Sequence, residues 1–463
     1  MMQPAVVFSA DPDISQSITH YLETHCGLKS THCVDAAAAC AALRGQGTPL
    51  LFVDLRDDWV TDETAMLLQS IERGLVDSIG LITVCDRFYP CQVAASADLL
   101  STGHLDYPFD SEQMHAVLGR LQSSPRGLAL KKIPDSHGAE ADGIRISTFT
   151  RALFPVIDQL SRVAVHNVTL LLVGETGTGK TTIAQLIHRL SPRRDKPFQN
   201  VACGALPVDL IESELFGHVR GAFTGADRSK IGRFEAAGRG TLLLDEIDVL
   251  GPKEQAKLLR VIETGEFESV GSTEMRLSKA RLIVASNVDL ETLMAKMRFR
   301  SDLYYRLNVL EFRLLPLRER PLDIVPMAMQ FVLECCQQHG VQIRRVHRDF
   351  LHALKKYRWP GNIRELKNQV QRSVLFSENG ELTIPDLSPA ILKAQYEDDA
   401  DSGENASSLA DRVAHSEREI LEDALRANGY KRTATAEALG ISRVGLYKKM
   451  RKYGMLEKKK QKT

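Results

Sequence analysis

The sequence predicts an α/β protein of three domains, and three observations support this prediction. At 463 residues the chain is too long for one hydrophobic core, so two to four domains are expected. Residues 1–122 and about 146–315 both alternate short apolar runs with helical stretches, as parallel α/β folds do. Turn-forming and charged residues dominate 123–145 and 395–412, which we interpret as linkers.

Each predicted domain has its own pattern. The first, 1–122, carries the apolar runs AVVFSA, LLFVDL and IGLITVC between helical stretches, which favours a doubly wound sheet. The second, 146–394, has three apolar strands in an α/β arrangement and then a helical lid over about 316–394. The third, 413–463, reads as short helices and is therefore predicted to be all-α.

Charge points to a nucleic-acid partner only at the C-terminal end. The whole chain is neutral, with 59 basic and 59 acidic residues, so net charge by itself excludes no class of partner. Residues 413–463, however, hold 13 Lys and Arg against 6 Asp and Glu. A small basic module at the end of a neutral protein is typical of a DNA-binding domain.

Neither the cysteines nor the apolar runs indicate export, a metal cluster or a membrane. The eight cysteines show no metal-site spacing, and most lie in apolar surroundings typical of reduced core residues. No apolar run approaches the roughly 18 residues that a membrane span needs. We therefore expect a soluble, cytoplasmic protein with no membrane partner.

A glycine-rich loop follows an apolar strand in TLLLVGETGTGKTT. Its pattern G-x-x-x-x-G-K-T, between a strand and a helical stretch, is typical of a phosphate-binding loop. Backbone N–H groups of such a loop point at phosphate oxygens, and we expect Lys180 to reach the β and γ phosphates and Thr181 to ligate Mg²⁺. The predicted nucleotide-binding residues of the loop are Gly174, Glu175, Thr176, Gly177, Thr178, Gly179, Lys180, Thr181 and Thr182.

Two acidic residues end a later apolar strand, in TLLLDEI. At the carboxyl end of a parallel strand we expect Asp245 to serve the magnesium ion that accompanies the nucleotide. Glu246 is predicted to orient or deprotonate the attacking water. The loop alone is equally compatible with simple nucleotide binding, whereas the acidic pair favours hydrolysis, so we predict an ATPase that uses ATP and Mg²⁺.

Several longer motifs occur in one order along the chain. They are GETGTGKT, ESELFGHVRGAFTGA, GTLLLDEI, FRSDLYYRLNV, LPLRER and WPGNIREL. This series resembles the bacterial enhancer-binding proteins, the AAA+ activators of sigma-54 RNA polymerase. The resemblance covers about 146–394 and extends to the tail, where ANGYKRTATAEALGISRVGLYKKMRKYGM is similar to their Fis-type helix-turn-helix.

The resemblance implies roles for further residues of the ATPase domain. Asn287 matches the first sensor beside the γ-phosphate, and Arg364 matches the second sensor in the lid. Arg300 and Arg306 match arginine fingers that reach a neighbouring subunit's nucleotide. Because a finger in trans acts only after assembly, the resemblance implies self-association, from a dimer to a hexameric or heptameric ring.

The resemblance also implies that one loop contacts sigma-54. Its residues are Gly221, Ala222, Phe223, Thr224, Gly225 and Ala226. A mobile tip with an aromatic anchor suits docking on a partner. Two departures concern the link between hydrolysis and this loop: Ala202 stands where the family has an asparagine that restrains the catalytic glutamate, and Val219 stands where an acidic residue is common.

The N-terminal domain resembles a response-regulator receiver with incomplete chemistry. Asp54, after LLFVDL, is the possible phosphoacceptor. Ser9 and Ala10 stand where two acids are expected, which leaves Asp11, and Tyr107 replaces the usual lysine. With too few carboxylates for magnesium, we favour a pseudo-receiver that senses a protein or small ligand over an active phospho-receiver.

The tail is predicted to bind DNA as a dimer on a palindrome. Gly440 gives the turn of the helix-turn-helix, and the second helix reads base edges at its start and meets phosphates further along. The predicted DNA-contacting residues are Ser442, Arg443, Val444, Lys448 and Lys449.

The sequence thus predicts a two-component-like transcriptional activator that hydrolyses ATP to remodel sigma-54 polymerase. The alternative is an ATP-binding, DNA-binding regulator that acts independently of sigma-54, either on ordinary polymerase or as a repressor. The other alternative is a remodelling ATPase of another class, such as a chaperone or helicase loader, which the basic tail and the GAFTGA loop disfavour.

Overall fold

The computed structural model describes residues 5–44, 50–56, 60–122, 131–132, 134–394 and Thr435. Contacts divide the chain into two units, Met1–Ile391 and Leu392–Thr463. Apart from Thr435, the predicted helix-turn-helix lies outside the described residues, as do its five predicted DNA-contacting residues. Among the residues described, no helix is both long enough and apolar enough to cross a membrane.

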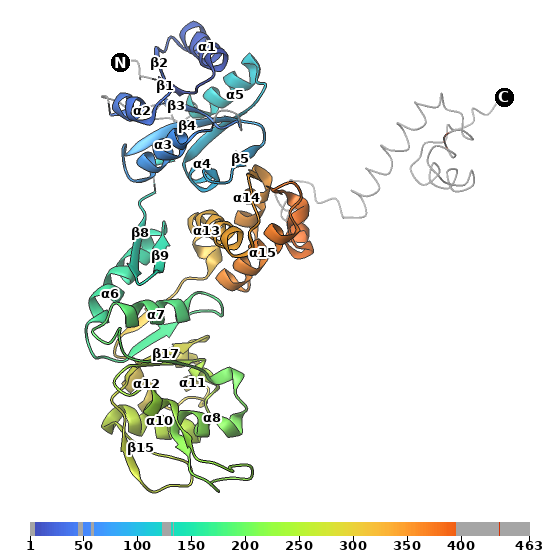
Figure 1. Ribbon diagram of the computed structural model, residues 1–463. Helices are drawn as coiled ribbons and strands as arrows, with labels where there is room; N and C mark the ends of the chain where they lie inside the picture. Colours follow the sequence, from blue (N-terminus) through green and yellow to red (C-terminus); the bar gives the residue numbers. More distant parts are fainter. Residues whose placement is uncertain are drawn as a thin grey trace, which may run out of the picture. The chain divides into compact units, whose positions relative to one another are not determined.

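The N-terminal domain is a doubly wound sheet, as the sequence predicts. Its parallel strands lie in the order β2-β1-β3-β4-β6, the order of flavodoxin-like folds. Helices α1 and α5 pack on one face over a shared apolar core, and α2, α3 and α4 contact one another in series (Figure 1). The elements are β1 (Ala5–Phe8), α1 (Pro12–Tyr21), β2 (Ser30–Cys33), α2 (Ala36–Leu43), β3 (Leu50–Asp54), α3 (Asp62–Glu72), β4 (Ser78–Cys85), β5 (Phe88–Pro90), α4 (Ala94–Leu100), β6 (Ser101–Asp106) and α5 (Ser111–Gln122).

Part of the predicted linker 123–145 is a folded hairpin. Strands β8 (His137–Ala141) and β9 (Ile144–Thr148) pair antiparallel, and their side chains alternate between half-buried and exposed. Asp142 and Gly143 both have positive φ, 46° and 78°, as the Asp-Gly turn of a two-residue hairpin requires. The Asp-Gly pair in the sequence is the signal that identifies this turn. A short strand, β7 (Lys131–Lys132), also lies in this segment and pairs with β4.

The ATPase-like domain is built on a second parallel sheet of order β11-β14-β17-β10-β18. Alternate residues of β10 face opposite sides, with Leu171 and Val173 in one apolar core and Leu170 and Leu172 in another. Both faces are therefore covered, which explains the continuous apolar runs in the sequence. The strands are β10 (Leu170–Val173), β11 (Phe198–Ala202), β14 (Thr241–Asp245), β17 (Arg281–Ser286) and β18 (Glu311–Arg313).

Helices flank this sheet, and two small hairpins pack against two of these helices (Figure 1). The hairpins pair β12 with β13 and β15 with β16. Their bounds are β12 (Gly217–His218), β13 (Lys230–Ile231), β15 (Glu266–Glu268) and β16 (Met275–Leu277). The helices are α6 (Phe154–Ala164), α7 (Lys180–Arg189), α8 (Val208–Phe216), α9 (Arg233–Ala236), α10 (Pro252–Thr264), α11 (Leu290–Ala295) and α12 (Ser301–Leu307).

The lid is helical, as predicted, and also shares a small sheet with the N-terminal domain. Its helices are α13 (Pro321–His339), α14 (Arg348–Lys356) and α15 (Asn362–Phe376), and its strands are β19 (Arg345–His347) and β20 (Glu381–Leu382). Strand β5 pairs antiparallel with β19, which pairs parallel with β20. Lys355 of the lid forms an ion pair with Asp98 at 2.6 Å, and Arg348 forms one with Asp106.

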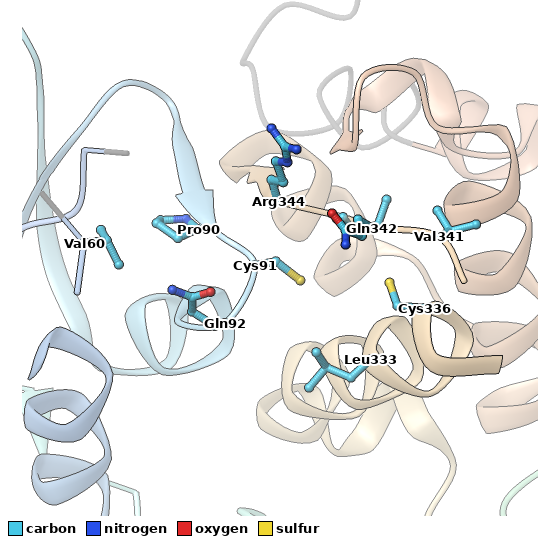
Figure 2. A pocket seen from close by; sticks show the side chains of 10 residues that line it. Val60, Pro90, Cys91, Gln92, Leu333, Cys336, Val341, Gln342 and Arg344 are labelled. Carbon is cyan, nitrogen blue, oxygen red and sulfur yellow. The ribbon is translucent and has the colours of Figure 1, made fainter. Parts of the chain in front are cut away.

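A cavity of about 490 Å³ lies beside this shared sheet. The side chains of Cys91 and Cys336 both point into it (Figure 2). Burial raises the pKa of the Cys91 thiol to about 12, so this thiol stays protonated at neutral pH.

Candidate nucleotide site and the GAFTGA hairpin

The predicted phosphate-binding loop connects β10 to α7. It begins directly after Val173, and Lys180 is the first residue of α7, so the loop amides and the helix N-terminus face the same space. Gly177 and Gly179 have positive φ, 80° and 103°. A Cβ on Gly177 would lie 2.3 Å from the Gly361 carbonyl oxygen, so the close approach of the lid requires glycine there.

Lys180 lies at the centre of this site. Its Nζ donates to the Gly174 carbonyl at 2.6 Å and to Asn287 Oδ1 at 2.7 Å. Burial is the main cause that lowers the pKa of Lys180, and the charge of Arg364 adds to this effect. The predicted first sensor and the predicted phosphate-binding lysine are therefore in direct contact.

The two acidic residues after β14 meet the loop at the carboxyl edge of the sheet. Thr181 Oγ1 donates to Asp245 Oδ2 at 3.1 Å, which brings together the two oxygen donors predicted for magnesium. Glu246 has a positive φ of 58°, and its Oε1 accepts from Asn287 Nδ2 at 3.2 Å. Asn287 thus contacts both Lys180 and Glu246.

The donor set fits magnesium. Among the residues described, no group of three His, Cys, Asp or Glu side chains could hold a metal ion. Mg²⁺ in nucleotide sites is commonly held by one or two protein oxygens together with phosphates and water. Thr181 and Asp245 supply a hydroxyl and a carboxylate of this kind.

Glu246 receives a hydrogen bond from Asn287 and not from Ala202, the last residue of β11. Ala202 ends β11 opposite Asp245, and Asn200 lies opposite Leu243, so Asn200 is two residues before the end of the strand. The hydrogen bond to Glu246 comes from Asn287, beyond the strand on the other side of β14.

The lid closes over the loop through contacts that sequence reasoning missed. Arg318 donates to both carboxylate oxygens of Glu175, at 2.6 and 2.8 Å, and Asn362 Nδ2 donates to Glu175 Oε2 at 3.2 Å. These hydrogen bonds, the Arg318 bonds first, lower the pKa of Glu175 to about 2. The Ile363 N–H donates to the Gly177 carbonyl at 2.9 Å, and the exposed Arg364 follows in the first turn of α15.

A mostly apolar cavity of about 410 Å³ adjoins the loop. Helices α6, α7, α13 and α15 line it together with β9, and Thr182 and Ile363 are among its residues. Its size and apolar lining suit a nucleotide base. No sequence motif identifies it, because its residues come from several elements that are far apart along the chain.

Arg300 and Arg306 lie at the two ends of α12, on the protein surface. Arg300 pairs with Asp302 through two hydrogen bonds of 2.7 and 3.0 Å, and Arg306 Nε donates to Glu263 at 3.1 Å. Their side chains are 46% and 60% exposed, so both are accessible to another subunit.

The GAFTGA loop joins β12 to β13 and forms an exposed tip. Phe223 is 37% exposed and packs edge-to-face on His218, with ring centroids 5.0 Å apart. Gly221 and Gly225 have φ of 80° and 100°, and the Gly221 N–H donates to the Ala226 carbonyl at 2.9 Å. Ala226 is buried at the base of the tip, whereas Thr224 is exposed. The tip thus presents an aromatic side chain on a tight glycine-flanked turn.

The fold and the site define the class of protein: an AAA+ P-loop nucleotide-binding domain with a helical lid. Residues 146–313 match the Sigma-54 interaction domain, 318–404 match the AAA+ ATPase lid domain, and 412–453 match the Bacterial regulatory protein, Fis family. The last match covers most of the predicted helix-turn-helix.

Three relatives illustrate the similarity. The Nif-specific regulatory protein of Azotobacter vinelandii is 45% identical over 265 residues, 57% of this chain and 50% of that protein. The Regulatory protein AtoC of Escherichia coli is 36% identical over 372 residues, 79% of this chain and 80% of that protein. The DNA-binding transcriptional regulator NtrC of Rhizobium meliloti is 34% identical over 426 residues, 85% of this chain and 86% of that protein.

The chain belongs to the family of sigma-54-dependent bacterial enhancer-binding proteins. It spans about half the length of the Nif-specific regulatory protein from Azotobacter and a larger part of the AtoC and NtrC relatives.

Proposed function

We propose that this protein binds DNA through its C-terminal domain and hydrolyses ATP to remodel sigma-54 RNA polymerase. We assign a regulatory role to the domain of residues 1–122, ATP hydrolysis to the domain of residues 146–394, and DNA binding to the domain of residues 413–463. One observation carries the proposal: Lys180, Asn287 and Glu246 form a continuous hydrogen-bonded chain at the sheet edge, in a domain that also presents an exposed GAFTGA tip.

Nucleotide binding follows from the loop and its adjoining cavity. The loop amides and Lys180 hold the phosphates, and the base occupies the 410 Å³ cavity. Thr181 and Asp245 would hold a magnesium ion beside the phosphates, and that ion would supply positive charge against the charge that develops during phosphoryl transfer. Because Arg318 and Asn362 tie the lid to Glu175, nucleotide binding and lid position are coupled at the loop.

Hydrolysis is assigned to Glu246 as the residue that orients and deprotonates water. Asn287 hydrogen bonds both to Glu246, the proposed catalytic base, and to Lys180, the lysine proposed to hold the γ-phosphate. Arg300 and Arg306 are exposed and held by exposed acids, so they are available to complete the site of a neighbouring subunit in a ring. Hydrolysis therefore depends on assembly.

The tip 221–226 is the surface proposed to contact sigma-54. Phe223 supplies an aromatic anchor, and the flanking glycines permit the turn without steric strain. At the base of the tip, the Val219 N–H donates to the Val270 carbonyl of the same domain. Movement of that domain with nucleotide state would then move the tip.

The test is the capture of purified sigma-54 in the presence of ADP and aluminium fluoride, which mimic the transferring phosphate. We expect the wild type to retain sigma-54 and Phe223→Ala to lose most of it. Leu277→Ala is the matched control, because Leu277 is an exposed apolar residue, 61% exposed, on the separate β15–β16 hairpin. Equal retention by Phe223→Ala and the wild type would contradict the role of the tip. Failure of the wild type to retain sigma-54 would favour a regulator that acts independently of sigma-54.

A further inference from the structure

The N-terminal domain holds an acidic site that the proposed ATPase mechanism does not use. Asp54 ends β3, and Asp11 follows β1, the neighbouring strand, so both carboxylates lie at the same edge of the sheet. In receivers this is the place of a divalent cation and of phosphoryl transfer. The Asp54 side chain is only 1% exposed.

A guanidinium lies between the two carboxylates. Arg56 Nη2 donates to Asp11 Oδ2 at 2.6 Å and to Asp54 Oδ2 at 2.9 Å, and Arg56 Nε donates to Asp54 Oδ1 at 3.1 Å. The Arg56 side chain is 11% exposed and lies over the Tyr107 ring, with Cζ 4.3 Å from the ring centroid. The Arg56 hydrogen bond is the main cause that holds the pKa of Asp11 below its usual value.

The remaining acceptor positions of Asp54 are also used. Ser9 Oγ donates to Asp54 Oδ2 at 2.9 Å, and the Arg56 N–H donates to Oδ1 at 3.2 Å. Each oxygen of Asp54 therefore accepts two hydrogen bonds. A carboxylate that attacks a phosphoryl group needs a free oxygen. Both oxygens of Asp54 are already engaged in hydrogen bonds.

The residues do not fit magnesium. Mg²⁺ requires oxygen ligands at close to 2 Å in octahedral geometry. Here the two carboxylates are bridged by one buried cation, and Ser9 is turned toward Asp54 as a donor. Binding a divalent cation would require Arg56 to leave a position where it makes three charge-assisted hydrogen bonds and covers an aromatic ring.

We propose that Arg56 is the built-in cation of this site, and that the N-terminal domain therefore takes up neither a divalent cation nor a phosphoryl group at Asp54. The guanidinium supplies permanently the charge neutralisation that a receiver obtains from a metal ion. The acidic site of this domain then has the same arrangement whether a phosphoryl donor is present or absent. This inference is independent of the proposed ATPase function.

The test uses Mn²⁺ as the probe for a magnesium site. Electron paramagnetic resonance measures how many Mn²⁺ ions bind to the full chain in the absence of nucleotide. We expect the wild type to bind no more ions than Asp54→Asn. Arg56→Asn should gain one ion per chain, with at least about tenfold tighter binding than the wild type at this site. The double variant Arg56→Asn/Asp54→Asn should lose the gained ion, and Arg56→Lys, which keeps the positive charge, should not gain it.

Two results would overturn the inference. One is a Mn²⁺ ion in the wild type that Asp54→Asn removes. The other is a folded Arg56→Asn protein that gains no ion, with folding checked by circular dichroism. If Arg56→Asn does not fold, the wild type is compared with Asp54→Asn after incubation with acetyl phosphate and Mg²⁺. Intact mass spectrometry should then show no phosphoryl adduct on the wild type beyond that on Asp54→Asn.

Discussion

The ATPase site and the acidic site of the N-terminal domain begin alike and end differently. In each, a buried parallel strand ends in an aspartate, Asp245 of β14 or Asp54 of β3. Beside Asp54, Arg56 bridges the carboxylates from within the same domain. Beside Asp245, the partners are the Thr181 hydroxyl and a backbone N–H, and the arginines proposed to complete the site are exposed on α12. An arginine within the domain therefore fixes the acidic site around Asp54, whereas a site completed by a ligand and a neighbouring subunit can be switched.

The largest expected effect tests whether a neighbouring subunit supplies an arginine to the ATPase site in addition to the site's own Lys180. Arg300→Ala should lower kcat for ATP hydrolysis by about 10³-fold or more, because a finger in trans stabilises transition-state charge. Arg260→Ala is a matched control, since Arg260 is 48% exposed and also pairs with surface acids. It should hydrolyse ATP like the wild type.

Mixing inactive variants makes this test specific to assembly. Arg300→Ala subunits keep an intact Glu246, and Glu246→Gln subunits keep an intact finger, so a mixture should recover measurable hydrolysis. A mixture that stays as inactive as its components would contradict the role in trans.

The next effect compares the two carboxylate sites directly. Glu246→Gln should lower kcat by about 10²- to 10⁴-fold, as expected for loss of a positioned base, while ATP affinity stays close to that of the wild type. Asp54→Asn should leave steady-state hydrolysis within about twofold, because Arg56 already neutralises that site in the wild type. A large loss of hydrolysis in Asp54→Asn would show that the N-terminal site controls the ATPase site.

A smaller effect concerns the exposed ion pair between loop and lid. Glu175 has a pKa of about 2 against its usual 4.5, because Arg318 and then Asn362 hydrogen bond to it. A lowered folded-state pKa means that the stabilisation is fully present above pH 4.5 and is lost as the pH falls toward 2. The melting temperatures of wild type and Glu175→Gln should therefore differ by a small constant amount above pH 5, and this difference should shrink as the pH falls from about 4.5 to about 2. A difference that grows on acidification would contradict this assignment.

The smallest effect is expected at Ala202. Ala202→Asn adds a polar side chain opposite Asp245, but Glu246 already accepts a hydrogen bond from Asn287. We expect a change of a few-fold in ATPase rate or in its response to sigma-54, by steady-state kinetics. Kinetics identical to the wild type would mean that Ala202 has no part in coupling hydrolysis to the tip.

Sequence patterns predicted the fold class because both sheets are parallel and buried. The runs at 170–173, 241–245 and 281–286 became β10, β14 and β17, since strands covered on both faces read as continuous apolar segments. The Asp142-Gly143 hairpin was missed because its strands alternate within a polar segment.

Contacts between distant residues could not be predicted in the same way. Glu175 and Arg318 are 143 residues apart, and only folding of the lid over the loop brings them together. Arg56 is close to Asp54 in sequence, but its function depends on the direction of its side chain toward Asp11, 45 residues away. Pairings that depend on side-chain direction leave no periodic signal.

The central claim is that ATP hydrolysis acts on sigma-54 polymerase through the exposed tip, and in vitro transcription tests it most directly. The measurement compares wild type and Thr224→Ala on a sigma-54-dependent promoter with ATP present or absent, and also measures ATPase activity of both proteins. We expect ATP-dependent transcripts with the wild type and their loss with Thr224→Ala, which should still hydrolyse ATP. Equal transcription by the two proteins, or transcription without ATP, would contradict it.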